Sequence, residues 1–421
     1  MKKNVWIMNH YAGSMLKARG GRHYWFADHL HRAGYQPVVF CCNVSHDPGT
    51  ETFYENEALW SEHRAEEIGV PFVFIRSNTY IGNGKDRIRN MWGFYRNVLK
   101  AARQYAAEHG APDVIYASSV HPLTLVAGLK LAKHFRVRCV CEVRDLWPET
   151  LVVYSERLRR SHLLKNALYA GEKWIYKKSD ALIFTQMGGP DYLRSKKWDR
   201  EQGGPIDMKK VHYINNGVDL EAFDNNLRQY RLNDSDLDGE DTFKFIYTGS
   251  IRRVNALGQI VDAAKEIRDP RISILVFGSG DDLEMLRERV EKEGLRNIRF
   301  KGRVDKQAVP YILSRADVNL VHWQMTPLLK YGESGNKIFE YFAAGKPVYY
   351  TVRPTYSLVE AYDCGCTAAG FSPKELAEGM EHMASLPKEE LDRMAKNARR
   401  AAQDYDFKNL TAKLIDVIES V

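Results

Sequence analysis

Short apolar runs alternate with longer amphipathic stretches along almost all of this 421-residue chain, and this alternation constrains the fold most strongly. The β-rich runs of the first half are Asn4–Asn9, Gln36–Cys42, Phe72–Ile75, Val114–Ala117, Val137–Val143, Ala181–Thr185 and Val211–Asn215. Those of the second half are Lys244–Gly249, Ile272–Gly278, Ile298–Gly302, Val318–His322 and Pro347–Thr351. Strands that are apolar throughout are covered on both faces, and strand–helix alternation implies parallel sheets with right-handed crossovers.

The length of the chain fits two domains of about 200 residues each. Between the halves, Asp224–Asp241 is rich in Asp and Asn and is interpreted as a linker. We therefore predict an α/β protein with two Rossmann-like parallel-sheet domains, residues 1–220 and 221–404, which face an interdomain cleft. Residues 405–421 are predicted to form a last helix that crosses back onto the first domain. Ligands of such sheets bind at the carboxyl ends of the strands.

Composition narrows the class of protein and its partners. No apolar run approaches the roughly 18 residues of a membrane span, and the apolar start is too short for a signal peptide, so we expect a cytoplasmic protein. The cysteines lack C-x2-C spacing and are expected to be buried and structural. A formal net charge of +7 favours anionic partners such as nucleotides, phospholipids or nucleic acid.

Three glycine-bearing turns lie between a predicted strand and a predicted helix, and they contain Gly20-Gly21, Gly249-Ser250 and Gly278-Ser279-Gly280. Glycine permits close backbone approach, and a helix N-terminus offers free N–H donors to phosphate. Each turn is equally compatible with a plain tight connection. The second turn continues into Arg252 and Arg253, and paired arginines there suit a diphosphate. The third is followed by carboxylates, which suit a base or ribose better than a phosphate.

Several common nucleotide-binding signatures are missing from the sequence. No G-x-G-x-x-G follows the first strand and no P-loop motif occurs, which disfavours dinucleotide oxidoreductases and P-loop NTPases. No Asp-x-Asp motif follows a strand, so we expect chemistry without a metal or a cofactor.

A series of motifs between Val211 and Gly370 resembles the family 4 retaining glycosyltransferases, which have the GT-B fold. They are Ile214–Asp219, Tyr247-Thr248-Gly249, Val276–Gly280, Phe300–Val304, Ala316–Val318 and Gly335–Val348. In the first half, Asn9–Gly13 with Arg22-His23-Tyr24, and Glu142–Glu149, are similar to the WbuB-like branch of bacterial surface-polysaccharide enzymes.

The resemblance implies an activity and its substrates. The enzyme would move a hexose, with retention of configuration and without a metal, from a nucleotide diphosphate sugar, with UDP favoured as the nucleotide. The acceptor would be a saccharide, free or linked to a polyprenyl diphosphate lipid. Glu340 matches the glutamate that holds the ribose hydroxyls, a task that suits a carboxylate because it accepts hydrogen bonds. Arg303 with Gly278 and Gly280 matches the wall around the base, and Asn336 with the Gly335 backbone matches the loop at the donor sugar.

The sequence departs from the family pattern at three places. The glutamate usually found eight positions before the Glu340 equivalent falls at Gly332, with Glu333 one step later. The usual Arg and Lys of the second turn fall at Ser250 and Asn255, so Arg252, Arg253 and Lys337 are expected to supply the charge. Gly21, expected at a phosphate, lies closer to its helix end at Gly34 than is usual.

Two polar residues of the first half follow strands and are expected at the carboxyl edge of the sheet. His121 is a candidate to hydrogen-bond either the donor sugar or the departing phosphate, or is a polar residue at a helix start. Asp145 is a candidate to orient the acceptor hydroxyl, or caps the following turn with Arg144 as partner.

Two basic, aromatic-rich stretches, Arg87–Arg103 and Arg157–Lys178, suit an anionic membrane surface, and each also fits an ordinary amphipathic helix.

Two other functions compete with glycosyl transfer. A UDP-sugar 2-epimerase would need no acceptor, and the Arg144–Glu149 stretch on the acceptor side disfavours it. A nucleic-acid-binding protein is disfavoured because the basic residues are interleaved with acids and no binding motif occurs.

Overall fold

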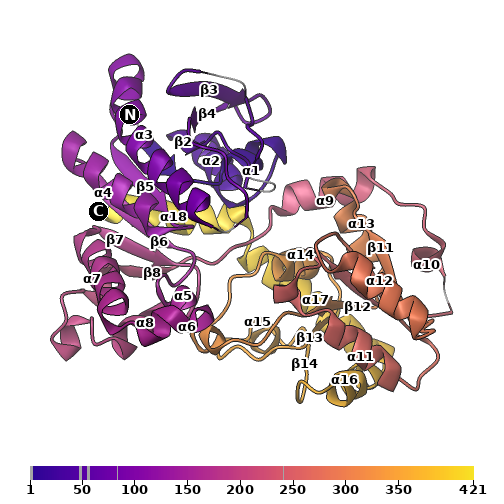
Figure 1. Ribbon diagram of the computed structural model, residues 1–421. Helices are drawn as coiled ribbons and strands as arrows, with labels where there is room; N and C mark the ends of the chain where they lie inside the picture. The colour runs from indigo at the N-terminus through magenta and orange to yellow at the C-terminus, as the bar shows by residue number, and fades with distance from the viewer. Residues whose placement is uncertain (1–2, 47–49, 55–56, 83, 240) are drawn as a thin grey trace. The chain divides into compact units, whose positions relative to one another are not determined.

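The computed structural model describes residues 3–46, 50–54, 57–82, 84–239 and 241–421. They form two compact units (Figure 1). The first contains the chain up to Asn215 together with Phe407–Val421, and the second contains Asn216–Asp406. Both units are parallel-sheet α/β domains, which confirms the predicted fold class.

The first unit is built on an eight-stranded sheet with the order β3-β4-β2-β1-β5-β6-β7-β8. Its strands are β1 (Asn4–Met8), β2 (Gln36–Cys42), β3 (Trp60–Ala65), β4 (Val70–Ile75), β5 (Val114–Ser118), β6 (Arg138–Val143), β7 (Ala181–Phe184) and β8 (Val211–Tyr213). Neighbouring strands run parallel except at the β3–β4 edge. In the central register, Val5 of β1 lies opposite Pro37 on one side and Val114 on the other.

Helices connect the strands of this unit. They are α1 (Gly13–Lys17), α2 (Arg22–Arg32), α3 (Lys85–His109), α4 (Pro122–Phe135), α5 (Glu149–Tyr154), α6 (Glu156–Arg160), α7 (His162–Lys178), α8 (Gly189–Ser195) and the short helices η1 (Arg200–Gln202) and η2 (Met208–Lys210). The C-terminal helix α18 (Phe407–Ser420) lies beside α2, as predicted. Phe407 packs edge-on against Phe26 with ring centroids 5.4 Å apart.

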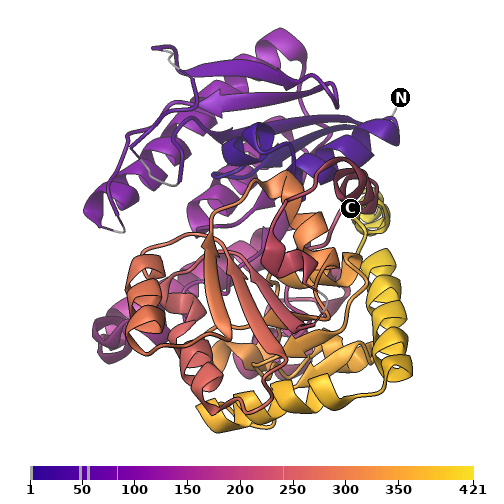
Figure 2. The ribbon, with the colours of Figure 1, turned by 90° about the vertical axis from the view of Figure 1, so that its right-hand side faces the viewer.

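The second unit is built on a six-stranded parallel sheet with the order β11-β10-β9-β12-β13-β14, and Figure 2 shows its strands side by side with helices around them. The strands are β9 (Phe243–Thr248), β10 (Ile272–Phe277), β11 (Ile298–Gly302), β12 (Val318–Val321), β13 (Val348–Tyr350) and β14 (Gly365–Thr367). The helices are α9 (Leu220–Gln229), α10 (Ser235–Asp238), η3 (Arg253–Asn255), α11 (Gly258–Glu266), α12 (Leu283–Lys292), η4 (Lys306–Ala308), α13 (Val309–Ser314), η5 (Pro327–Tyr331), α14 (Lys337–Ala343), α15 (Leu358–Ala361), α16 (Pro373–Ser385) and α17 (Lys388–Asp404).

The segment interpreted as a linker is part of the second unit. Apart from residue 240, which lies outside the described residues, residues 224–241 run through the end of α9 and the whole of α10. Asp219 caps α9 by accepting a hydrogen bond from the Ala222 N–H, and Phe223 and Leu237 are buried. Each of the two short helices is held in the second unit by one buried apolar side chain, so the interpretation from polar composition alone was wrong.

Two further features concern the whole chain. The cysteines of the structure are free thiols and all but the half-buried Cys366 are buried, as expected for structural residues. Among the described residues, no helix is both long enough and apolar enough to cross a membrane.

Candidate functional site

The glycine turns of the second unit lie against one another at the carboxyl ends of β9, β10 and β11. Past the strand ends, the Gly249 N–H donates to the Phe277 carbonyl at 2.9 Å, and the Gly278 N–H donates to the Gly302 carbonyl at 2.7 Å. Further on, the Ile251 N–H donates to the Ser279 carbonyl at 2.9 Å. Because the three strands are neighbours in the sheet, this hydrogen bonding aligns the three turns at one edge.

Close packing explains why glycine occupies these turns. Gly249 and Gly278 have φ values of 142° and 149°, which residues other than glycine rarely adopt. A Cβ atom on Gly278 would lie 1.7 Å from the Gly249 carbonyl oxygen, and one on Gly249 would lie 2.3 Å from Cε of Lys337. The glycines therefore let the two turns and a lysine side chain approach one another.

Lys337, the first residue of α14, is the basic centre of this edge. Its Nζ donates to the Tyr247 hydroxyl and lies 4.1 Å from the centroid of that ring. The Tyr247 hydroxyl in turn donates to the Ser250 carbonyl at 2.8 Å. Burial lowers the pKa of Lys337 to about 7, against the opposing effect of Glu340. The ammonium and the neutral amine are therefore both populated near pH 7, and a nearby anion would favour the ammonium.

Helix α14 is fastened to the end of β9. The Tyr341 hydroxyl accepts from the Thr248 N–H at 2.9 Å and donates to the Thr248 carbonyl at 3.2 Å. Lys337 and Glu340 are three residues apart on this helix and share a face. Burial raises the pKa of the half-buried Glu340, whereas Lys306 and Lys337 lower it. The helix thus presents a carboxylate and an ammonium group together.

The loop before α14 contains the remaining predicted donor-site residues. Glu333 is 8% exposed, and burial raises its pKa to about 7 while the neighbouring Tyr350 hydroxyl opposes the shift. A Cβ atom on Gly335 would lie 3.3 Å from the ring of Trp323, so the loop packs closely on an indole. Asn336 is exposed, and its side chain makes no capping hydrogen bond to α14.

Three predicted arginines of this edge are exposed. Arg252 lies against the Gly278–Gly280 turn, since a Cβ atom on Gly280 would be 3.0 Å from Cγ of Arg252. Within the described part of the chain, the side chains of Arg253 and Arg303 form no ion pair or hydrogen bond with the protein. Ser250 donates from Oγ to Asn255 at 2.9 Å, which braces the second turn. The edge therefore offers exposed cations beside tightly packed backbone.

In the first unit, His121 lies directly before α4 and belongs to a buried chain of side chains. Its Nε2 is 2.9 Å from Nδ1 of His10, whose Nε2 is 2.9 Å from Oδ1 of Asn90. Burial, with a smaller contribution from Arg87, lowers the pKa of His121 to about 3. Burial and His121 hold the pKa of His10 well below its usual range. Both imidazoles are consequently neutral at physiological pH.

Gly21 and Asp145 also follow strands of the first unit. Gly21 precedes α2 with φ of 106°, and a Cβ atom there would lie 3.1 Å from Cγ of Met15. Asp145 is exposed after β6, in a turn whose Arg144 carbonyl accepts from the Gln186 amide at 2.6 Å. Helix α5 begins only at Glu149, with Pro148 as its N-cap, so Asp145 caps no helix.

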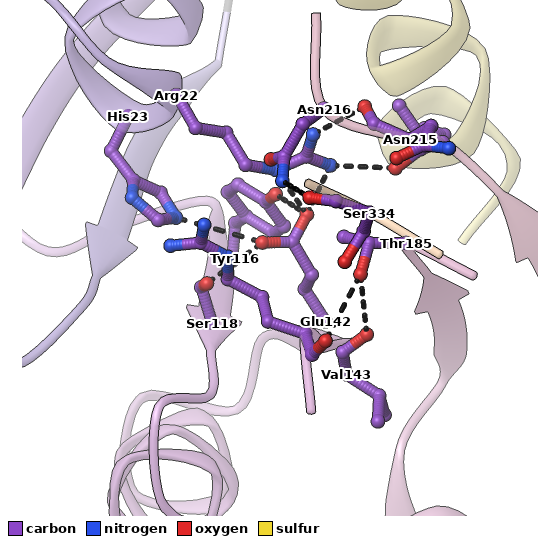
Figure 3. A network of polar contacts seen from close by, with 12 residues as sticks. Arg22, His23, Tyr116, Ser118, Glu142, Val143, Thr185, Asn215, Asn216 and Ser334 are labelled. Carbon is purple, nitrogen blue, oxygen red and sulfur yellow. Dashed lines mark hydrogen bonds and ion pairs between the residues drawn. The ribbon is translucent and has the colours of Figure 1, made fainter. Parts of the chain in front are cut away.

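Figure 3 shows a buried ionic network in the first unit that was not predicted from the sequence. Nε of Arg22 donates to Glu142 Oε2 at 2.8 Å, and its Nη2 donates to the Ile214 carbonyl at 2.9 Å. The hydroxyls of Tyr116 and Ser118 also donate to the Glu142 carboxylate. Although burial favours the neutral acid, the Arg22 guanidinium outweighs it and holds the pKa of Glu142 well below its usual range. The network anchors the chain just before the first unit ends.

A signal for this network was present in the sequence, because Glu142 is a carboxylate that follows three apolar residues within a strand. No comparable signal marks Tyr247, Tyr341 or Asn90. Each belongs to a segment whose pattern is explained by ordinary packing, and each makes a polar contact with a distant part of the chain.

Two family models match the chain over these two units. The model described as Glycosyltransferase Family 4 matches residues 24–222, and the model described as Glycosyl transferases group 1 matches residues 232–401. The matches support a family 4 glycosyltransferase of the GT-B fold. TuaH of Bacillus subtilis, which bears the name of a teichuronic acid biosynthesis glycosyltransferase, is 26% identical over 229 residues, or 52% of each chain.

A shorter match adds a second relative. WcaI of Escherichia coli, named as a colanic acid biosynthesis glycosyl transferase, is 31% identical over 86 residues, which are 20% of this chain and 21% of WcaI. The chain thus spans about half the length of the first relative and about a fifth of the second.

Solved structures share the fold of this chain. A sucrose-phosphate synthase from Thermosynechococcus elongatus superimposes with a TM-score of 0.71 at 18% identity, covering 100% of this chain and 99% of that one. Anabaena HepE in complex with UDP gives 0.68 at 15% identity, with 99% and 100% covered. A UDP-N-acetylglucosamine 2-epimerase from Listeria monocytogenes gives 0.61 at 11% identity, with 100% and 96% covered. At these identities the likeness establishes the GT-B fold alone.

Proposed function

We propose that this protein transfers a hexose from a nucleotide diphosphate sugar to a saccharide acceptor in the synthesis of a bacterial surface polysaccharide. The observation that carries this proposal is the edge of the second sheet, where Lys337 meets the Gly249 and Gly278 turns beside the exposed Arg252. Glycosyl transfer depends on a stabilised diphosphate leaving group, and fixed cations and backbone amides provide that stabilisation.

Each part of a nucleotide sugar has a counterpart at this edge. Lys337 and Arg252 neutralise the diphosphate, and Arg253 and Ser250 add charge and a hydroxyl to the same turn. Glu340 accepts hydrogen bonds from the ribose hydroxyls. A second set of residues lines the base and the donor sugar, and it consists of Gly278, Gly280, Arg303, Glu333, Gly335 and Asn336. UDP is the favoured nucleotide because the HepE neighbour binds UDP, and no metal is required in this scheme.

The proposed reaction retains the anomeric configuration, as in family 4. The bond between C1 of the sugar and the diphosphate breaks, and the acceptor oxygen bonds to C1 from the same face. The proton of the acceptor hydroxyl passes to the departing phosphate oxygen. Asp145 orients the acceptor, and a product of inverted configuration in an NMR spectrum would contradict this mechanism.

Nucleotide binding tests the donor site without knowledge of the acceptor. Thermal unfolding is followed with UDP, GDP, ADP, dTDP and CMP, each with and without EDTA. A ligand at 100 times its dissociation constant adds about 2.7 kcal/mol to the folded state. We expect one nucleoside diphosphate, UDP, to stabilise the protein independently of EDTA. Lys337→Ala should abolish the shift, whereas Lys374→Ala, which removes an exposed lysine of α16, should preserve it.

The epimerase alternative is separated by an acceptor-free assay. An epimerase converts the nucleotide sugar alone, whereas the proposed transferase releases nucleoside diphosphate only when an acceptor is present. The fold likeness to the Listeria epimerase makes this control necessary.

We further propose that the first unit binds the inner face of an anionic membrane, where a polyprenyl-diphosphate-linked acceptor resides. Tyr154, Leu163, Leu164 and Trp174 are all exposed, Leu163 to 88%. The exposed Arg157 and Arg160 lie on α6, between Tyr154 and Leu163 in the sequence. Apolar anchors flanked by cations suit an anionic interface. By contrast, Phe94 and Tyr95 of α3 are core residues, so only Ile88 and Trp92 of that helix remain as anchors.

Flotation with liposomes at low salt tests membrane binding. We expect the wild type to float with vesicles that contain phosphatidylglycerol and to stay behind with neutral vesicles. Leu163→Ser with Leu164→Ser should reduce flotation. The matched control is Met285→Ser, which changes a residue 58% exposed on α12 of the second unit. Equal flotation of both variants would contradict the proposal.

A further inference from the structure

His121 lies at one end of a chain of buried hydrogen bonds that continues through His10 to Asn90. We propose that Asn90 and His10 are positioning residues that hold His121 as its Nε2–H tautomer, which leaves Nδ1 to accept a hydrogen bond from a saccharide hydroxyl. This inference rests on the proposed transferase function, and it selects the sugar over the phosphate as the partner of His121.

The orientation of Asn90 sets the direction of the chain of hydrogen bonds. Its Nδ2 donates to the carbonyl oxygen of Asn78, which can only accept, and also contacts Cys42 Sγ at 3.9 Å. The amide oxygen Oδ1 therefore faces Nε2 of His10 at 2.9 Å. Because an amide oxygen is an acceptor, His10 must carry its proton on Nε2.

His10 passes this direction on to His121. The His10 ring is completely buried, with the Phe94 ring centroid 4.4 Å away, and it is neutral because burial and His121 disfavour the cation. A neutral imidazole holds one proton, so Nδ1 of His10 is a lone pair. Nε2 of His121, 2.9 Å away, must then be the donor.

His121 ends the chain with an acceptor that the protein does not use. Its ring is neutral, so Nδ1 carries a lone pair. This atom is buried and has no hydrogen-bond partner among the described residues. Oγ1 of Thr124, in the first turn of α4, is likewise buried and unpartnered within that part of the chain. Buried polar atoms without partners are uncommon, so two at the start of one helix indicate a place for a polar ligand group.

Burial and the charges around His10 and His121 disfavour a cationic His121. Arg87 of α3 donates to the Tyr11 hydroxyl at 3.2 Å, and its positive charge disfavours protonation of both histidines. His46 stacks on Tyr11 with ring centroids 4.3 Å apart and also disfavours a cationic His10. A neutral nitrogen lone pair repels a phosphate oxygen but accepts from a hydroxyl. Of the two partners considered for His121, the sugar hydroxyl is therefore selected.

The tautomer is measured directly by two-bond ¹H–¹⁵N correlation NMR of the full chain labelled with ¹⁵N-histidine. The His121 signals are assigned by their loss in His121→Asn. Between pH 6 and 8 we expect a pyridine-type Nδ1 and a pyrrole-type Nε2. A proton on Nδ1, or on both nitrogens, would overturn the inference even if the protein proves to be a transferase.

A pair of His10 variants tests the positioning role. His10→Asn places an amide oxygen at the position of Nδ1 and keeps the acceptor, whereas His10→Leu removes it. We expect kcat to fall about tenfold in the Leu variant, the effect of one lost hydrogen bond, and to be rescued in the Asn variant. Both variants lose the ring, so a merely structural role would lower the folded fraction and kcat of both alike, and that result would overturn the positioning role.

The pH dependence separates a hydroxyl partner from a phosphate partner. If His121 accepts from a hydroxyl, the ratio of wild-type kcat to His121→Asn kcat stays constant between pH 6 and 8. A ratio that grows towards low pH would identify a cation that binds phosphate and would contradict the inference. If no sugar transfer is found at all, the proposed function fails, while the NMR measurement still decides whether the tautomer is fixed.

Discussion

At the scale of single residues, the behaviour of Lys337 follows from its packing. The ammonium lies over the Tyr247 ring, and burial brings its pKa to about 7. An anion bound beside it stabilises the charged form, so binding takes up a proton when the pH is above this value. The affinity of the site for a diphosphate should therefore depend on pH in a way that an exposed lysine would not produce.

We predict that the affinity for UDP-glucose increases as the pH falls from 8 to 6. The change should approach tenfold per pH unit above pH 7 and level off below it, because one proton is bound with the ligand. Lys337→Arg keeps the charge at every pH and should remove the dependence. Isothermal titration at three pH values measures both proteins, and an unchanged slope in the variant would contradict the assignment.

Glu172 of α7 gives a second prediction at this scale. It is 4% exposed and accepts hydrogen bonds from the hydroxyls of Tyr176 and Tyr192, both at 2.8 Å. Burial raises its pKa to about 8, above the ordinary value of 4.5. Between pH 4.5 and 8 the unfolded chain releases this proton whereas the folded protein keeps it. The free energy of unfolding is therefore highest below pH 4.5 and falls as the pH rises through 8.

We expect Glu172→Gln to remove this loss. Relative to the wild type, the free energy of unfolding of the variant should rise with pH between 5 and 8, by up to about 1.4 kcal/mol per unit. Urea unfolding at four pH values gives the difference. Glu149→Gln, a neighbouring carboxylate that pairs with Lys196, is the control and should not reproduce the trend.

The candidate site was predictable from sequence where a motif lies within one segment. Gly249, Gly278, Lys337 and Glu340 carry local signatures, and the structure brings Gly249 against both Gly278 and Lys337. Tyr247 supports Lys337 from 90 residues away, and His10 meets His121 from 111 residues away. Such contacts depend on strand order, which the periodicity of one sequence does not determine.

At the scale of elements, Arg22 and Glu142 connect α2 to the centre of the first sheet. Both side chains are almost completely buried, and the carboxylate also receives Ser118 Oγ at 2.7 Å. Taking two charges out of water is costly, and the pair is stable only while both partners remain.

We predict that Glu142→Gln lowers the free energy of unfolding of the first unit by about 3–5 kcal/mol, because it leaves the buried guanidinium uncompensated. The double variant Arg22→Met with Glu142→Gln should recover part of the loss. Glu156→Gln, which breaks an exposed pair with Arg160, should change stability by less than about 1 kcal/mol. Urea unfolding followed by circular dichroism measures all three variants, and equal losses for Glu142→Gln and Glu156→Gln would contradict this prediction.

The prediction of elements was most reliable for buried strands. The continuous apolar runs of β1, β2, β9 and β10 are found as predicted. The strands that the sequence analysis missed, β3 and β14, are edge strands. The sequence of β3, WSEHRA, is mostly polar, and that of β14, GCT, is only three residues long. An edge strand has a neighbour on one side only and is often short or polar, so a search for apolar runs does not find it.

At the scale of the whole molecule, two α/β units were predictable because strand and helix patterns alternate in both halves. The boundary was harder to place from composition. The first unit ends at Asn215, because Val218 pairs with Asp406 and Asp219 caps α9 within the second unit. These contacts join residues far apart in sequence, whereas the Asp- and Asn-rich segment further on is locally helical.

The central proposal is that this protein is a glycosyltransferase, and release of nucleoside diphosphate tests it most directly. Purified protein is supplied with UDP-glucose and a panel of other UDP-hexoses, with and without polyprenyl-diphosphate-linked saccharides, and UDP is quantified over time. We predict UDP release that requires an acceptor, that EDTA does not change and that Lys337→Ala abolishes. Turnover of the nucleotide sugar at the same rate without any acceptor would contradict the account and favour the epimerase alternative.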